Sequence, residues 1–169
     1  MVAVGSQQHM KKRLKIAMVF SSDPSKAGGV QEHILYLSKE LIKLGHRVHI
    51  YGPEKNIYRY TNYHPISEVV ILPVPNGNWA NITVKNNEKH EVAEIIEKGK
   101  FDIIHIHEPY IPFINWDVYK NTSAVKVATF HTAWNNDSII NLINPFLTLF
   151  KETFSTYFKA AIFVSKIGK

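Results

Sequence analysis

The chain has 169 residues, of which 45% are hydrophobic and 20% charged, a composition that excludes disordered, fibrous and membrane-spanning classes and is typical of one globular domain. Its formal net charge is +6, but four basic residues lie within positions 11–15, so 6 − 4 leaves about +2 for the rest. Without a basic face or groove, no nucleic-acid partner is predicted. The absence of cysteine excludes disulfides, thiolate zinc sites and cysteine nucleophiles.

The amino terminus predicts neither export nor a membrane anchor. The apolar run at 16–20 is far shorter than the hydrophobic segment of a signal peptide, and no small-residue cleavage site follows it. We therefore expect a cytoplasmic protein. Residues 1–9, which end just before Met10, are interpreted as a cloning leader, so the expected domain covers residues 10–169.

The first half of the chain predicts strands around one amphipathic helix. Residues 14–20 suit a buried strand, and 21–29 have the composition of a loop. Apolar residues then recur at helical spacing up to Gly45, which is expected to end the helix. They are Val30, Ile34, Leu37, Leu41 and Leu44, with Leu35 and Ile42 widening the stripe. Further strands are predicted over 48–51 and 69–74, whereas 54–67 shows no clear period.

The second half continues the alternation. The predicted elements are a surface helix over 87–98, a strand over 101–107, a turn at 109–112, a short helix near 116–120, a strand over 125–130 and a last strand over 160–164. A longer helical pattern runs from Ser138 to Phe154, with Pro145 expected to kink it. Its aromatic stripe, which continues to Phe158, is interpreted as core and not as a membrane contact.

Strands that alternate with helices favour parallel pairing with right-handed crossovers. The predicted fold class is therefore α/β, with a doubly wound, Rossmann-like parallel sheet. Ligands of such sheets gather outside the carboxyl ends of the strands. In this sequence those ends are 21–29, 75–81, 107–112 and 131–137, and they are rich in glycine, asparagine and histidine. This edge of the sheet is the predicted site.

Two groups at this edge suggest chemistry. Gly28 and Gly29 open a helix, where backbone N–H groups can hold a phosphate or a sugar oxygen, but a flexible turn with a cap fits them equally well. Their spacing matches neither a dinucleotide fingerprint nor a P-loop.

The second group consists of histidines. His105 and His107 share one strand face and His131 can approach from the next strand end, so three imidazoles could hold zinc. Hydrogen-bonded histidines are much commoner, and no metal site is predicted. Glu108 is interpreted either as a carboxylate that orients a sugar hydroxyl or as a solvated strand end.

Three segments, in order, resemble a known family. They are Gly28-Gly29-Val30-Gln31-Glu32-His33 with the helix to Leu44-Gly45-His46-Arg47-Val48, then Phe101-Asp102-Ile103-Ile104-His105-Ile106-His107-Glu108-Pro109, and Val127-Ala128-Thr129-Phe130-His131-Thr132. Together they are similar to the amino-terminal domain of retaining glycosyltransferases of the GT-B fold, family 4, and within it to the phosphatidylinositol mannosyltransferase branch. The resemblance covers Lys15 to Ser165.

The resemblance implies that a hexose, mannose or glucose, moves from a nucleotide sugar such as GDP-mannose or a UDP-sugar to a lipid or glycan acceptor, with retention. It also implies that no metal ion or other cofactor is needed. By the same resemblance, His131 is the catalytic residue beside the transferred sugar, and Gly28 and Gly29 contact the donor diphosphate. The implied acceptor-binding residues are Gln31, Asn76, His107 and Glu108.

The family's donor-binding domain would follow Ser165 and is absent from this chain, so the fragment alone is expected to be inactive. The alternative is a stand-alone sugar- or acceptor-binding half-enzyme that needs a separate donor domain. A histidine-metal hydrolase is a third hypothesis. The basic stretch at 11–15 is suited to peripheral contact with the inner face of a membrane.

Overall fold

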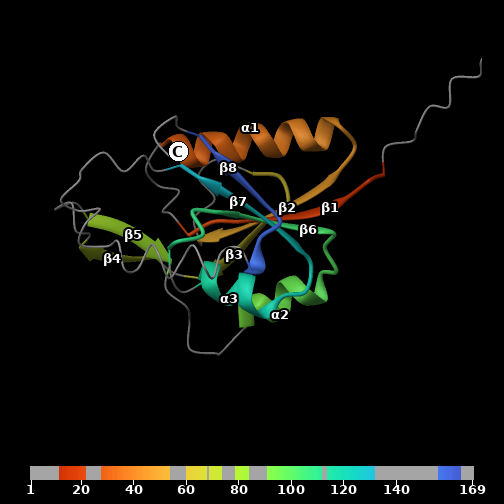
Figure 1. Cartoon of the computed structure of the whole chain (residues 1–169). Helices are drawn as coiled ribbons and strands as arrows, with labels where there is room; N and C mark the ends of the chain where they lie inside the picture. Colours follow the sequence, from red (N-terminus) through yellow and green to blue (C-terminus); the bar gives the residue numbers. More distant parts are fainter. Residues whose placement is uncertain are drawn as a thin grey trace, which may run out of the picture.

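A six-stranded parallel sheet forms the centre of the computed structural model, which describes residues 12–21, 28–53, 60–67, 69–73, 79–83, 91–111, 114–131 and 156–164 (Figure 1). In spatial order the strands are β3 (Tyr63–Ser67), β2 (Arg47–Pro53), β1 (Lys15–Val19), β6 (Ile103–His107), β7 (Val125–Phe130) and β8 (Ala160–Phe163). Numbered along the chain, this is the 3-2-1-4-5-6 order of Rossmann sheets. The predicted fold class is confirmed.

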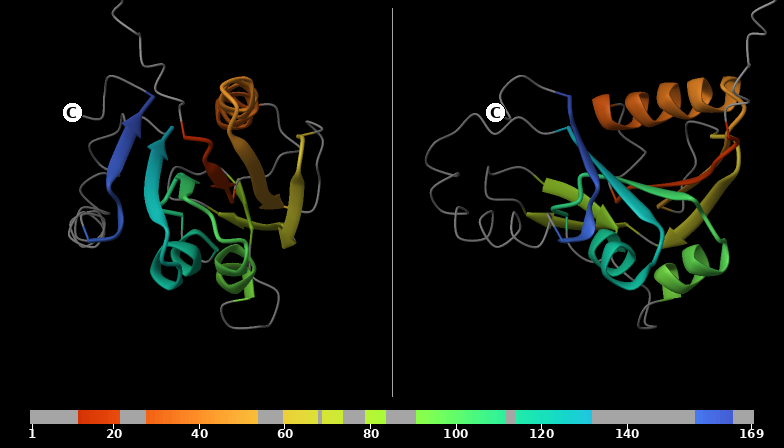
Figure 2. Two further views of the ribbon diagram at one scale, coloured as in Figure 1. Left: turned by 90° about the vertical axis from the view of Figure 1, so that its right-hand side faces the viewer. Right: turned by 45° about the vertical axis from the view of Figure 1, so that its right-hand side comes forward.

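Helices cover both faces of this sheet. Helix α1 (Gly29–Lys43) lies on one face, and α2 (Glu91–Lys98) and α3 (Ile114–Asn121) lie on the other (Figure 2). The alternation of side chains along β1 divides the core accordingly. Met18 packs in a cluster with Ile34 of α1, whereas Ala17 belongs to a cluster that holds Val118 of α3. Each face of the sheet therefore has its own apolar layer.

Helix α1 begins and ends as its sequence predicts, but it turns a narrower apolar face to the sheet. Gly45 adopts a φ of +92° and its N–H donates to the carbonyl of Ile42, while the N–H of His46 donates to Leu41, which together form a Schellman motif. Two residues of the predicted stripe, Ile42 and Leu44, are exposed. Leu44 lies beyond the last helical residue, so its side chain leaves the helical face.

The segment after β2 differs from the prediction. Residues 69–74 were expected to be a strand of the main sheet, but β4 (Val69–Pro73) pairs antiparallel with β5 (Trp79–Thr83) in a separate two-stranded sheet. The strand that pairs with β2 at the edge of the main sheet is β3, which lies within the segment that shows no clear period. Pro65 obscures this strand in the sequence, and it is tolerated because β3 is an edge strand.

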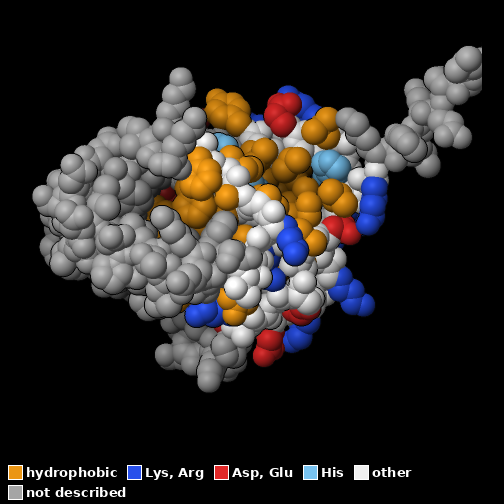
Figure 3. Space-filling model, viewed as in Figure 1, with side chains coloured by type: hydrophobic (Ala, Val, Ile, Leu, Met, Phe, Trp, Pro, Cys, Tyr) orange, Lys and Arg blue, Asp and Glu red, His pale blue; other side chains and the backbone are white. Residues whose placement is uncertain are grey.

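The opposite edge of the sheet is apolar and exposed. Hydrophobic side chains gather on the face shown in Figure 3, and the side chains of Ile162, Phe163 and Val164 at the β8 edge are all exposed. Phe158 packs in the core, as predicted for that residue, whereas the rest of the aromatic helical pattern lies outside the described residues. Among the described helices, none has both the length and the apolar character needed to span a bilayer.

Candidate functional site

The order of the strands fixes where a ligand site is expected. The sheet grows in one direction from β1 to β2 and in the other from β1 to β6, so the connections leave in opposite directions between β1 and β6. A crevice opens at such a switch point, outside the carboxyl ends of the strands. Residues 20–21 follow β1, Glu108 follows β6 and His131 follows β7. Residues 21, 107–108 and 131 of the predicted edge thus lie at strand ends around the switch point, whereas 79–81 belong to β5 of the separate sheet, which corrects the assignment of 75–81 to this edge.

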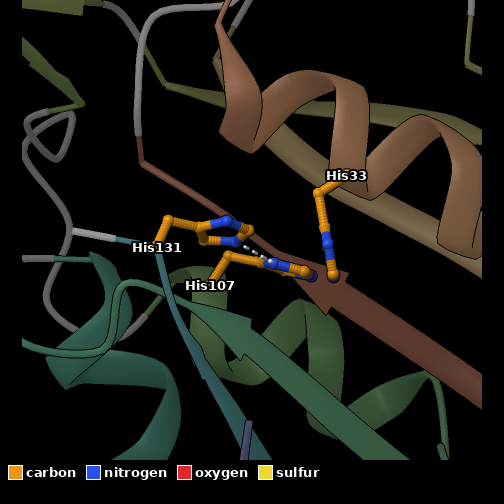
Figure 4. Close-up of side chains that lie close together, drawn as sticks. All are labelled: His33, His107 and His131. Atoms are coloured by element: carbon orange, nitrogen blue, oxygen red, sulfur yellow. Dashed lines mark hydrogen bonds between the residues drawn. The ribbon is translucent and has the colours of Figure 1, made fainter. Parts of the chain in front are cut away.

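Three histidines from three different elements meet at this edge. His33 comes from α1, His107 is the last residue of β6 and His131 directly follows β7, and the three side chains point toward one another (Figure 4). Nδ1 of His107 lies 3.0 Å from Nε2 of His131. The His33 ring centroid lies 4.9 Å from that of His131 and 5.8 Å from that of His107. We call these residues the histidine cluster.

Two nitrogens of the cluster lack partners. Nε2 of His33 and Nε2 of His107 are both buried and make no hydrogen bond within the described structure. The side chain of His107 is fully buried, with 0% of its surface exposed. Buried polar atoms are normally paired, and leaving one unpaired costs about 1–3 kcal/mol. These atoms are therefore candidates for contact with a ligand.

Burial keeps the cluster neutral near pH 7. Burial, with the nearby His33 adding to the effect, lowers the pKa of His131 to about 4. Burial also lowers the pKa of His107 well below its ordinary value, with His105 and His131 adding to the effect. Neutral imidazoles offer lone pairs and N–H groups, not positive charge. The cluster can hydrogen-bond hydroxyl groups or bind a cation, whereas an anion needs another partner.

That partner is available at the amino terminus of α1. Gly28 is extended, with φ −160°, and its carbonyl accepts the first helical hydrogen bond from Glu32. A Cβ added to Gly29 meets nothing within 4 Å in the described part of the chain. Neither glycine has the positive φ that a turn would require. Gly28 is the N-cap residue of α1, as the cap interpretation predicts, and the positive end of the helix dipole beside it is a place where an anion can bind.

A buried asparagine fastens the ends of β1 and β6 together. Asn115 of α3 donates from Nδ2 to the carbonyls of Glu108, at 2.9 Å, and His107, at 3.2 Å. Its Oδ1 accepts a hydrogen bond from Ser21 at 2.9 Å. Glu108 adopts a φ of +55°, and its N–H donates to Thr129 of β7. Asn115 therefore holds the backbone that carries His107 and Glu108.

The structure corrects two interpretations at this edge. His105 belongs to no histidine triad with His107 and His131, because its Nε2 lies 2.7 Å from Oγ1 of Thr129 while His33 occupies the third place. Glu108 is not a solvated strand end, because only 9% of its surface is exposed. Of the predicted acceptor-binding residues, Gln31 is buried on the first turn of α1, whereas Asn76 lies outside the described residues.

Sequence reasoning missed His33 and Asn115. His33 lies within the glycine-helix segment, three residues after Val30 and four before Leu37, so the helical period places it on the inner side of α1. Asn115 carries no comparable signal, because an asparagine near the start of a short helix is ordinarily a surface residue or a cap.

Comparison with known proteins relates this arrangement to a family. The model for Glycosyltransferase Family 4 matches residues 27–167. The phosphatidyl-myo-inositol mannosyltransferase of Mycolicibacterium smegmatis is 29% identical over 140 residues, which are 82% of this chain and 36% of that protein. The protein of the same name from Propionibacterium freudenreichii is 30% identical over 141 residues, 79% of this chain and 37% of the relative.

Among solved structures, the catalytic domain of starch synthase IV from Arabidopsis thaliana bound to ADP and acarbose is 19% identical. It aligns with a TM-score of 0.42 over 72% of this chain and 34% of that one. The chain spans little more than a third of the length of the curated relatives named above.

Proposed function

The chain belongs to glycosyltransferase family 4, and on this premise we propose that it forms the acceptor-side lobe of a retaining hexosyltransferase. The proposed donor is a nucleotide sugar, GDP-mannose or a UDP-sugar, and the proposed acceptor is a lipid or a glycan. The observation that carries the proposal is the meeting of an open helix amino terminus and a neutral histidine cluster at the switch point of the sheet.

The donor diphosphate is assigned to the amino terminus of α1. In the transfer, the bond between the sugar and the diphosphate breaks, and negative charge grows on the leaving phosphate. The N–H of Gly29, together with the positive end of the helix dipole, can stabilise that charge. The open space around Gly29 supports this assignment, because a phosphate must approach the backbone closely.

His131 is assigned to the transferred sugar. The ring of His131 is half-buried and contacts the fully buried His107. It therefore has a fixed position beside the crevice. A neutral imidazole can hydrogen-bond a sugar hydroxyl without attracting the diphosphate away from α1. In this proposal, His131 aligns the sugar for transfer and no metal ion takes part in the reaction.

The acceptor is assigned to the same edge of the sheet. His107, Glu108 and Gln31 are buried close to it, and Asn76 completes the proposed set. The basic residues at positions 11–15 support peripheral contact with an anionic membrane surface, the inner face in this proposal, where a lipid acceptor would lie.

The test uses the longest protein that the reading frame of this chain encodes. We expect that protein, given GDP-mannose or UDP-glucose and vesicles of phosphatidylinositol, to form a glycolipid whose anomeric configuration, read by NMR, equals that of the donor. We expect the 169-residue chain alone to form none, because it spans little more than a third of the length of its curated relatives. An inverted product, or turnover by the chain alone, contradicts the proposal. Turnover only after mixing with a separate donor domain supports the half-enzyme alternative.

A further inference from the structure

We propose that the histidine cluster is a binding site for a transition-metal dication, with Zn²⁺ as its preferred occupant. His33, His107 and His131 each offer one ring nitrogen, and these three nitrogens all lie within 4.8 Å of one another. They come from α1, from the end of β6 and from the residue after β7, so the fold itself brings them together. Figure 4 shows the three rings directed at one point between the helix and the sheet.

The spacing is close to that of a metal site. Zinc binds imidazole nitrogens at about 2.0–2.1 Å, so two nitrogens of a tetrahedral site lie about 3.4 Å apart. His107 and His131 are already at 3.0 Å. The outermost nitrogen pair of the cluster, within 4.8 Å, must close by about an ångström or more to fit. His33 is half-buried on a helix surface, so a small rotation of its side chain can supply that movement.

The unpaired nitrogen of His33 gives a second, independent reason. The contact between His107 and His131 satisfies one nitrogen of each ring, yet Nε2 of His33 and Nε2 of the fully buried His107 remain without partners in the described structure. Each ring binds an ion through one nitrogen, so if His107 binds through Nδ1, which faces His131, the atom that gains a partner is Nε2 of His33. A cation held between the rings explains why a third imidazole is directed into the same space without a carboxylate or hydroxyl to bond it.

The donor set selects the class of metal. Within the described residues, the cluster consists of imidazoles alone. Imidazole suits Zn²⁺, Cu²⁺ and Ni²⁺, whereas Mg²⁺ and Ca²⁺ prefer oxygen ligands. Three protein ligands leave a fourth position for an oxygen atom of a bound molecule or for water.

The site has a consequence for the transferase, which rests on the proposed function. If His131 contacts the transferred sugar, it cannot bind a metal ion at the same time. Zinc and the sugar therefore compete, and added Zn²⁺ is expected to inhibit transfer. Metal binding itself does not depend on the proposed function and can be measured on this chain.

The test is a titration of the chain with Co²⁺, which reports a tetrahedral site by visible absorption, and with Zn²⁺, quantified by mass spectrometry after dialysis. We expect one ion per chain. His33→Gln should weaken Co²⁺ binding more than about 100-fold, the upper value for losing a residue that only hydrogen-bonds to a metal ligand. His49→Gln is the matched control, because His49 also lies 3.0 Å from another histidine, His64, but outside the cluster. Its affinity for Co²⁺ should not change.

Two results overturn the proposal. One is the absence of stoichiometric binding, and the other is binding that survives in His33→Gln, which assigns the ion to histidines elsewhere. If circular dichroism shows that His33→Gln does not fold, His131→Gln, at a half-buried position after β7, makes the same test. If His33→Gln loses Co²⁺ binding but the wild-type full-length protein transfers no sugar, the metal site is supported and the transferase proposal is refuted. If the full-length protein transfers sugar but Co²⁺ binding survives in His33→Gln, only the metal site is refuted.

Discussion

Two groups of histidines lie on opposite faces of the same sheet, and each contains a pair of ring nitrogens 3.0 Å apart. The histidine cluster lies under α1 at the carboxyl ends of β6 and β7. The pair of His49 and His64 lies on the other face, where His49 packs edge-on against Phe101, just before β6.

The contact distance does not distinguish these two groups. The cluster adds a third ring, two buried nitrogens without partners and a place at the switch point of the sheet. The pair has neither a third histidine in contact nor that position, as far as the described residues show. The position of a histidine group relative to the strand ends, more than the distance between its rings, therefore distinguishes the candidate site from the other pair.

The largest expected effect is on turnover when the cluster loses His131. His131→Ala in the full-length enzyme should lower kcat by about 100- to 1000-fold while the Kd for the nucleotide sugar changes much less, because the proposed contact strengthens in the transition state. Single-turnover kinetics and a donor-binding titration separate the two quantities. His49→Ala, on the opposite face, should leave both near the wild-type values. Equal losses of kcat and of donor affinity in His131→Ala would refute its catalytic role.

Glycine substitutions sharpen the contrast between an open site and a packed one. Gly29→Ala should fold normally, since its Cβ meets nothing within 4 Å in the described structure, yet it should lower kcat/KM for the donor by about tenfold or more. Gly52→Ala is the control with the opposite behaviour. Its Cβ would overlap the ring of Phe20 and lie 2.8 Å from the Tyr63 hydroxyl, so we expect a loss of about 1–3 kcal/mol in stability.

Urea unfolding and donor kinetics on both glycine variants make this test. If Gly29→Ala unfolds early and binds the donor normally, then the glycine serves the helix cap and not the diphosphate. A Gly52→Ala variant of wild-type stability would show that Phe20 moves aside without cost.

Asn115 tests whether the cluster depends on its backbone support. Asn115→Ala leaves the carbonyls of His107 and Glu108 and the hydroxyl of Ser21 without this partner, so we expect stability to fall by about 2–3 kcal/mol. Asn121→Ala, also on α3, loses exposed hydrogen bonds to Asp117 and should change stability by less than about 0.5 kcal/mol. Urea unfolding measures both values. Similar losses in the two variants would show that Asn115 has no special role at the strand ends.

The sequence predicted the class of the fold better than its pairing. Alternating apolar runs and helical periods indicated a parallel sheet, and the paired histidines of β6 were assigned to the correct edge because strand ends of a parallel sheet coincide. The segment 69–73 was correctly predicted as a strand, but not its partner. Whether a strand joins the main sheet or a nearby hairpin depends on the competing β3, whose Pro65 hides it from pattern analysis.

The composition of the cluster lay beyond the sequence for a different reason. His105 and His107 share a strand face, which made both of them candidates, but the hydroxyl of Thr129 engages His105. The helical period places His33 on the inner side of α1, but its meeting with His107 and His131 depends on how α1 lies on the sheet, a property of the assembled layers. Likewise, burial of Asn115 follows from the packing of α3 against the strand ends and not from its local sequence.

The smallest expected effect concerns the pH dependence of stability on the face of the His49 pair. Burial lowers the pKa of His49, and the charges of His64, Lys15 and Arg47 lower it further. The unfolded chain then binds a proton more readily than the folded one, so the contribution of His49 to stability is present above about pH 6.5 and is lost as the pH falls. Because the group is partly exposed, we expect less than about 1 kcal/mol.

The measurement compares how much the free energy of unfolding changes with pH in the wild type and in His49→Gln. The free energy of unfolding of the wild type and of His49→Gln is compared at about pH 7.5 and about pH 5, a range that includes the ordinary pKa of histidine. The histidine cluster is the same in both proteins, so its titration cancels and only the contribution of His49 remains. His49→Gln should lose less stability on acidification than the wild type. An equal loss of stability in both proteins would mean that His49 is protonated as easily in the folded state as in the unfolded one. The His49–His64 pair and the histidine cluster would then differ in their electrostatics as well as in their position.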